Sequence, residues 1–175
     1  MSEYGKTIAP DTLRLERLLP GPIERVWAYL TEPDKRAKWF AGGPMELRVG
    51  GDVKLHFKHA ELSDEKVAPD KHRKHEGHSL ESRITAYDPP RLLGITWGEP
   101  KDGVVTFELE PRGKDVLLVI THSRVAERSS LKGFAGGWHA HVDILDDVLN
   151  NRAPRGFWSN HAKLEAEYQK RIAAQ

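Results

Sequence analysis

The sequence predicts an α+β domain in which a curved antiparallel sheet wraps around one long C-terminal helix. Three features of the 175 residues lead to this fold class: short segments with strand alternation, two short helix signals near the N-terminus, and a sustained helical period after residue 129. A sheet of this size needs cover for its apolar face, and the long helix is the only large apolar stripe available. We expect one domain over 1–175, with a core of about 12–151 and a helical tail of about 152–175.

The N-terminal part begins with one strand and two short helices. Leucines alternate with charged residues over 12–19, which is the pattern of a half-buried strand. Pro20-Gly21-Pro22 interrupts this strand, and apolar residues at helical spacing then predict a helix over 22–31. A second short helix is expected over 33–40, ended by Gly42-Gly43.

A meander of six strands follows. Residues 45–49 and 52–58 are predicted as two strands joined by Gly50-Gly51, a two-residue hairpin signal. The highly charged segment 59–77 is predicted as a long surface loop. Four more strands are expected, with short turns that favour antiparallel pairing. They span 79–87, 92–98, 104–110 and 115–122.

Two helices complete the chain. Apolar residues recur at steps of three and four from Phe134 to Leu149, which predicts a helix that begins near Ser129 and ends before Pro154. A further helix is expected over 159–173. Its apolar residues need cover, so the tail either packs on its own domain or joins a second copy, and we expect a homodimer. These residues, with the preceding tryptophan, are Trp158, Leu164, Tyr168 and Ile172.

Composition excludes several classes of function. The formal charge is +1, without the clustered basic face that nucleic acid or an anionic membrane needs. The absence of cysteine excludes disulfides, thiolate metal sites and a cysteine nucleophile. Residues 1–11 lack the apolar core of a signal peptide, and no apolar run approaches the ~20 residues that span a bilayer. We therefore expect a cytoplasmic protein that binds neither nucleic acid nor membrane.

An ordered series of short motifs resembles a known family. The motifs are Pro22-Ile23-Glu24-Arg25-Val26-Trp27, Lys38-Trp39-Phe40, Leu47-Arg48-Val49-Gly50-Gly51-Asp52, Asp88-Pro89-Pro90-Arg91-Leu92-Leu93, Val119-Ile120-Thr121-His122-Ser123 and Gly136-Gly137-Trp138. In this order they resemble the activator-of-Hsp90-ATPase-like branch of the START/Bet v 1-like superfamily, whose members share a helix-grip fold. The charged loop 59–77 and the helical tail after Asn151 depart from the family pattern.

The resemblance implies a cavity between the sheet and the long helix. Members of the superfamily mostly bind hydrophobic molecules such as lipids, sterols, polyketides and aromatic compounds, and some are cyclases. Eukaryotic Hsp90 activators carry this domain beside a second, N-terminal one, for which we expect no room before residue 12. The resemblance therefore implies a small hydrophobic or aromatic ligand, no cofactor, and a lesser expectation of chaperone activation.

Twelve side chains are candidates for the lining of this cavity. An aromatic wall near Trp39 and Phe40 suits a flat apolar ligand, although these two rings, Trp97 and Trp138 could instead fill the core. The small residues before Trp138 let the helix approach the sheet. The twelve candidates are Trp27, Trp39, Phe40, Phe57, Trp97, Phe107, His122, Phe134, Trp138, His141, Val142 and Leu145.

No assembled catalytic set accompanies the predicted cavity. His122, His139 or His141 could border it and act as a base or a hydrogen-bonding group, or each could be a satisfied structural histidine. A buried carboxyl group could take a raised pKa suited to proton transfer, although strand alternation places Glu108 toward solvent. The acidic candidates are Glu46, Glu81, Glu108 and Asp143.

The nine histidines raise the question of a metal site. His72, His75 and His78 stand three apart, and so do His56 and His59, a spacing that would share one face of a helix. Three basic residues within 71–74 and Gly77 argue against a helical chelate, because cations beside a metal ion are unfavourable. We expect a solvated loop and no metal.

Three classes of function remain open on the sequence alone. We favour a binding module for a small hydrophobic molecule, which needs an aromatic cavity but no acid–base pair. A cyclase or hydrolase of aromatic or polyketide substrates would need a histidine or carboxylate inside the cavity with a hydrogen-bonded partner. A protein-interaction module, including chaperone partnership, would show an exposed apolar patch without a cavity.

Overall fold

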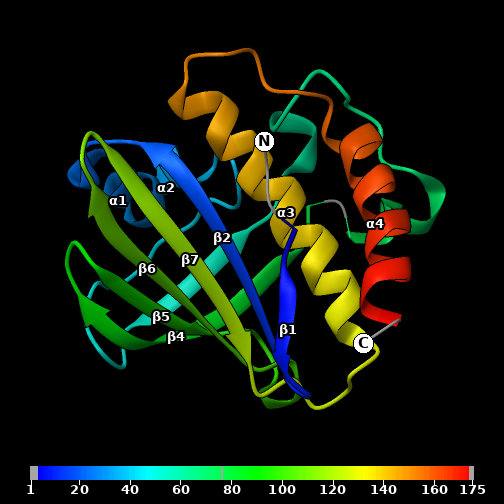
Figure 1. Ribbon diagram of the computed structural model, residues 1–175, viewed down its shortest axis with the longest axis horizontal. Coiled ribbons are helices and arrows are strands. Elements are labelled where there is room, and N and C mark those ends of the chain that lie inside the picture. The colour runs from blue at the N-terminus through cyan, green and yellow to red at the C-terminus, as the bar shows by residue number, and fades with distance from the viewer. Residues whose placement is uncertain (1–3, 76, 174–175) are drawn as a thin grey trace.

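The computed structural model describes residues 4–75 and 77–173, with the side chains of 73–75 and 173 outside that description. Its seven strands form one sheet in the order β1-β2-β7-β6-β5-β4-β3, and all neighbours are antiparallel. The sheet curves around a long helix, so the predicted fold class is confirmed (Figure 1). The strands are β1 (Lys6–Ala9), β2 (Thr12–Pro20), β3 (Asp52–His56), β4 (Ser79–Asp88), β5 (Leu92–Thr96), β6 (Val104–Arg112) and β7 (Asp115–Ser123).

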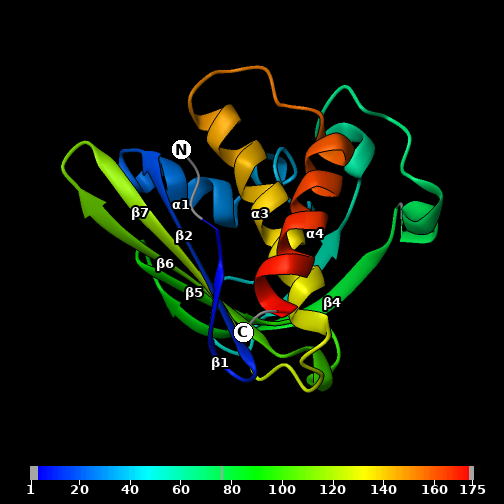
Figure 2. The same cartoon turned by 45° about the vertical axis from the view of Figure 1, so that its right-hand side comes forward.

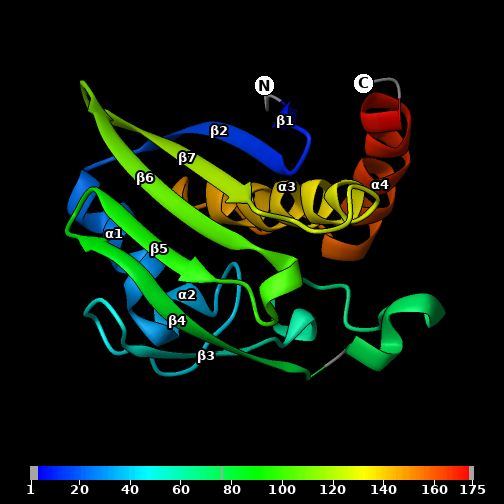
Figure 3. The same cartoon turned by 90° about the horizontal axis from the view of Figure 1, so that it is seen from below.

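The helices gather on the inner face of the sheet. Helix α3 (Ser130–Leu149) packs beside β2, and α4 (Phe157–Ala173) covers the side of α3 that faces away from the sheet (Figure 2). The short helices α1 (Ile23–Thr31) and α2 (Pro33–Arg36) lie at one end of the sheet, where α1 contacts β6 and β7 (Figure 3). Because α3 is covered from both sides, most of its residues are buried.

The alternation of apolar and polar residues that predicts a strand also sets how that strand pairs with its neighbour. In β2, Leu13, Leu15 and Leu19 are buried while Arg14 and Leu18 are exposed, and the strand pairs with β7 from Leu13↔His122 to Pro20↔Asp115. This pairing joins the first strand of the predicted core to the last one. It therefore encloses the apolar side chains between the sheet and α3.

A buried polar network fixes α4 on the rest of the chain. The Tyr168 hydroxyl lies 2.8 Å from Nδ1 of His139 on α3. Asp143, also on α3, accepts hydrogen bonds of 2.8 Å from Arg17 of β2 and from Asn160 of α4. The tail thus packs on its own domain, the first of the two alternatives above. Its buried apolar residues are Phe157, Trp158, Leu164, Tyr168 and Ile172.

Two of the predicted elements are wrong. Residues 45–49 form no strand: only an isolated bridge joins Met45 to Val53, and Leu47 and Val49 are exposed. The chain turns tightly at Gly51, where an added Cβ would lie 2.1 Å from the carbonyl oxygen of Glu46. The alternation of Leu47 and Val49 therefore had no partner strand to meet.

The second predicted helix, 33–40, is too long at its C-terminal end: α2 ends at Arg36, and residues 37–40 form a turn.

Other differences are additions. Strand β1, which the sequence pattern did not predict, pairs with β2 at the sheet edge. The predicted loop 59–77 contains two short 3-10 helices, η1 (His59–Glu61) and η2 (Asp70–His75), and a third, η3 (Pro100–Asp102), follows β5. Within the described residues, no helix combines the length and the apolar character needed to cross a bilayer.

Candidate functional site

A small aromatic pocket lies between the start of α3 and the end of β5. Its volume is about 100 Å³. Cavities that hold drug-sized ligands measure about 300–1,000 Å³, whereas an apolar cavity of about 150 Å³ can hold benzene. The gap between sheet and helix is therefore mostly filled by side chains, and the space left is smaller than the cavity that holds benzene. The lining residues are Phe40, Phe57, Trp97, Gly133, Phe134, Gly137, Trp138 and His141.

Arg36 holds the turn that presents Phe40 to the pocket. Its guanidinium group is buried and donates hydrogen bonds to the carbonyl oxygens of Leu30, Thr31 and Ala41, and to that of Gly43. Burial lowers the pKa of Arg36 to about 10, which leaves it charged at neutral pH. The end of α1 and the chain after α2 are thus fixed by one side chain, because the orphan carbonyl groups need donors.

Two glycines leave space on the pocket side of α3. An added Cβ at Gly133 or Gly137 would meet no atom within 4 Å, whereas a Cβ at Gly136 would lie 3.7 Å from the backbone of Glu165 in α4. Gly133 is exposed and Gly137 is partly exposed, so the helix lacks side chains where the pocket reaches the surface. These glycines therefore leave open the entrance to the pocket.

The indole of Trp138 is held in place from the sheet. Its Nε1–H donates a hydrogen bond of 3.0 Å to Nδ1 of His122, whose Nε2 lies 2.6 Å from the carbonyl oxygen of Asp102. A carbonyl oxygen only accepts, so the proton of this imidazole is on Nε2 and Nδ1 is the acceptor. Burial lowers the pKa of His122 to about 4. His122 also stacks on Phe134, with 4.2 Å between ring centroids. It is thus a positioning residue behind the pocket wall.

His141 supplies the polar side chain of the pocket. Its Nδ1 donates a 2.8 Å hydrogen bond to the carbonyl oxygen of Trp39, and Nε2 has no hydrogen-bond partner among the described residues. Burial lowers the pKa of His141 to about 3, with a further contribution from His59. The imidazole is therefore neutral and presents one acceptor nitrogen. With so low a pKa it is a weak general base.

The remaining predicted lining residues lie around the pocket rather than in its wall. Trp39 is buried and donates from Nε1 to the carbonyl oxygen of Tyr29 at 2.7 Å, and Phe107 packs edge-on against Trp138 at 5.6 Å. Trp27 is half-buried and meets Tyr87 of β4, 6.0 Å between centroids. Two further predicted residues, Val142 and Leu145, are fully buried in the core.

The other titratable candidates from the sequence lie elsewhere. Glu46, Glu81 and Glu108 are exposed. His139 and Asp143 belong to the network that holds α4, where burial lowers the pKa of His139 to about 4. Among the residues that line the aromatic pocket, His141 is the one titratable group, so the structure brings together no acid–base pair there.

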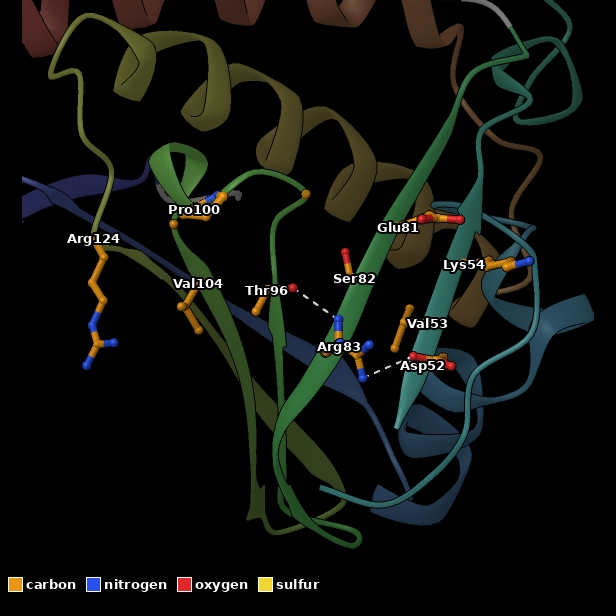
Figure 4. A pocket seen from close by; sticks show the side chains of 12 residues that line it. Asp52, Val53, Lys54, Glu81, Ser82, Arg83, Thr96, Pro100, Val104 and Arg124 are labelled. Atoms are coloured by element: carbon orange, nitrogen blue, oxygen red, sulfur yellow. Dashed lines mark hydrogen bonds and ion pairs between the residues drawn. The ribbon is translucent and has the colours of Figure 1, made fainter. Parts of the chain in front are cut away.

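A second hollow, of about 640 Å³, lies where β4 separates from β5 (Figure 4). Here β4 pairs with β3 up to Arg83, and its pairing with β5 starts at Ile84. Arg83 pairs with Asp52 at 3.2 Å, and Figure 4 shows Lys54 and Arg124 pointing away from each other. The charged side chains of this hollow thus pair with neighbours or face solvent. They do not converge on a common point.

The glycines of the pocket entrance were not predicted as site residues. Gly133 and Gly137 are four apart in a helix that otherwise follows the apolar period, so they share one face. Two glycines on one face of a helix indicate either that another element packs closely against that face or that the space beside it is open. The sequence does not say which of the two applies.

Comparisons with known proteins agree with this architecture. A family model described as "Activator of Hsp90 ATPase homolog 1-like protein" matches residues 20–150. A Bordetella parapertussis protein solved by NMR is 39% identical, with a TM-score of 0.81 over 97% of this chain and 93% of that one. A search of the curated proteins found no match.

Two more distant structures share the fold. CalU16 from Micromonospora echinospora is 18% identical, with a TM-score of 0.69 over 97% of this chain and 94% of its own. DynU16, a protein of the dynemicin biosynthetic locus, is 18% identical, with a TM-score of 0.63 over 82% of this chain and 49% of its own. At this identity the likeness concerns the fold alone.

Proposed function

Because the chain belongs to the activator of Hsp90 ATPase homolog 1-like family, whose members commonly bind hydrophobic ligands, we propose that it binds a small aromatic molecule. The observation that carries this proposal is the pocket of about 100 Å³, walled by aromatic rings and open beside two glycines. Offset and edge-to-face packing against such rings stabilises a flat ligand. Our proposed ligand is a single ring, or one ring of a larger system that extends through the entrance.

His141 narrows the class of ligand. His141 lines the pocket with a neutral imidazole, and its Nε2 has no hydrogen-bond partner among the described residues, so a ring with a hydroxyl or N–H group would gain a hydrogen bond that a hydrocarbon cannot make. We therefore infer a preference for phenol-like rings over benzene-like ones. A hydrogen bond to a neutral group contributes about 0.5–1.5 kcal/mol, which is a preference of about two- to tenfold.

An enzyme and a protein-interaction module are the less supported alternatives. Acid–base catalysis in this pocket would rest on His141 alone, with its low pKa. The exposed large apolar side chains of the described residues, Ile8, Leu18, Leu47, Val49 and Val67, are spread over β1, β2 and two loops. A cytoplasmic location and a homodimer remain proposals. Since the apolar tail is covered within the chain, a dimer would use another surface, and light scattering tests it.

The binding proposal can be tested by titrating phenol and benzene into the labelled protein while recording two-dimensional NMR spectra. We expect phenol to shift the indole N–H signals of Trp97 and Trp138 and to bind more tightly than benzene. Gly137→Ala should weaken phenol binding at least fivefold, because the new methyl group enters the open space. Gly136→Ala is the matched control: it adds the same methyl group toward α4 and should leave binding unchanged.

Native mass spectrometry of the freshly purified protein complements the titration. An excess mass that is lost on denaturation would identify a co-purified ligand by its mass. The proposal is wrong if phenol shifts signals far from Trp97 and Trp138, or if Gly137→Ala and Gly136→Ala bind it equally well.

A further inference from the structure

A group of metal-binding side chains lies outside the aromatic pocket, where the loop 59–77 meets α4. His72 of η2 and His161 and Glu165 of α4 each offer one ligand atom, and these atoms all lie within 4.8 Å of one another. His161 and Glu165 are four apart on α4, so they share one face of the helix. We propose that these three residues form a binding site for a zinc-type divalent cation.

The geometry is close to that of a metal site. Nε2 of His72 lies 3.9 Å from Oε2 of Glu165. Zinc bonds to nitrogen and carboxylate oxygen measure about 2.0–2.2 Å, so ligand atoms around a tetrahedral ion are about 3.4 Å apart. The separations in the group are at most 4.8 Å, so each must shorten by no more than about 1.4 Å to reach that spacing. Two imidazoles and one carboxylate, with a fourth position open to water, form a ligand set that zinc accepts.

Lys71 makes the site weaker than its ligands alone would be. Its ammonium group pairs with Oε1 of Glu165, while Oε2 is the oxygen that faces His72. A metal ion on Oε2 would therefore lie near a fixed positive charge, which is unfavourable. The side chains of His72 and Glu165 are 22% and 29% exposed, so an ion can reach them from solvent.

A bound ion would add to the contacts that already join the loop to α4. Two contacts already join them near the start of α4: Ser63 accepts a hydrogen bond from the backbone N–H of Phe157 at 2.9 Å, and Glu65 accepts one from that of Ser159 at 2.8 Å. The ion would strengthen the link about one to two turns further along the helix, where Lys71 already pairs with Glu165. This site differs from the chelate that the histidine spacing suggested, because the partners of His72 come from α4 rather than from the loop. His75, a member of that spacing, has its side chain outside the described part.

Isothermal titration of the metal-free protein with zinc chloride tests the proposal. We expect one ion per chain, with binding at least tenfold weaker in His72→Gln, His161→Gln and Glu165→Gln. Lys71→Gln should bind zinc more tightly, by about threefold or more, because the competing charge is removed. His56→Gln is the control. His56 is an exposed histidine of β3 that forms a hydrogen bond with Ser79 of β4, and it is not part of the proposed site.

A second readout does not depend on heat signals. The indole of Trp158 stacks on His72 and lies 5.8 Å from His161, so copper(II) at the site should quench its fluorescence. Quenching should disappear in the His72→Gln/His161→Gln double variant. Zinc affinity that is equal in this double variant, or lower in Lys71→Gln, would overturn the proposal, as would the absence of binding.

Discussion

Nε1 of Trp138 donates a hydrogen bond to Nδ1 of His122 across the space between α3 and β7, at 3.0 Å. The opposite nitrogen of His122 is occupied by the carbonyl oxygen of Asp102. The central ring of the pocket wall is therefore fixed by one imidazole that has no freedom to exchange its donor and acceptor. A residue of the sheet, His122, thus fixes the position of a ring that lines the pocket.

Breaking this contact should cost stability. His122→Phe leaves the indole N–H and the Asp102 carbonyl without their partner, and we expect a loss of about 2–3 kcal/mol in the free energy of unfolding. Trp138→Phe should cost a similar amount. Urea unfolding of both single variants and the double variant gives the coupling energy. A double variant whose loss equals the sum of the two single losses would show that the bond contributes nothing.

Arg36 is a second residue whose side chain keeps the pocket in shape, because it holds the turn that presents Phe40. Arg36→Met keeps the length of the side chain but removes the donors to four carbonyl groups. We expect a loss of about 2–4 kcal/mol, because buried acceptors are left unpaired. Lys35→Met, at the partly exposed neighbouring position, should change stability by less than about 0.5 kcal/mol. Equal losses in the two variants would contradict this account.

The glycines at the pocket entrance should be costly for the helix. Alanine has a higher helix propensity than glycine by about 0.8–1 kcal/mol, and an added methyl group at Gly133 or Gly137 meets no other atom. Gly133→Ala and Gly137→Ala should therefore each raise the melting temperature. Thermal unfolding followed by circular dichroism measures this. A lower melting temperature for either would mean that the space is not open.

Stability should fall as the pH falls below neutral. Burial lowers the pKa values of His122 and His139 to about 4 and that of His141 to about 3, from the ordinary histidine value of 6.5. The unfolded chain then binds protons that the native chain does not, so stability is full above about pH 6.5 and is lost toward pH 4. Each histidine contributes a slope of up to ~1.4 kcal/mol per pH unit.

Urea unfolding between about pH 7.5 and pH 5 checks this slope, because glutamates and aspartates begin to protonate mainly below that range. His141→Gln should reduce the slope by up to ~1.4 kcal/mol per pH unit. A slope that His141→Gln leaves unchanged would show that this histidine is not buried in its neutral form.

The packing of α4 on the domain should depend on the hydroxyl group of Tyr168. The Tyr168 hydroxyl accepts from the backbone N–H of Gly5 at 2.6 Å and shares a hydrogen bond of 2.8 Å with Nδ1 of His139. Tyr168→Phe should therefore lower the free energy of unfolding by about 1–3 kcal/mol. Tyr87→Phe is the control, since the Tyr87 hydroxyl makes no hydrogen bond within the described residues. A loss as large in Tyr87→Phe would contradict the role of the network.

Local patterns account for what the sequence predicted well. The leucines of β2 and the apolar period of α3 each mark one face of an element, and burial of that face is the main force on it. The motif series indicated the family correctly for the same reason, because its residues are placed at turns and faces that the fold requires. Residues 45–49 show the limit: alternation predicts a strand only where another strand is within reach.

By itself, the sequence determined the fold class, the order of the main helices and strands from β2 to α4 apart from residues 45–49, and the aromatic character of the space between sheet and helix. Only the tertiary structure decided how much of that space is left, because cavity volume depends on rotamers and packing across the whole core. It also decided that the tail lies on its own domain and that His72 meets His161 and Glu165 rather than its neighbours in the loop. Contacts between residues about 90 positions apart leave no periodic pattern in the sequence, so the sequence alone does not predict them.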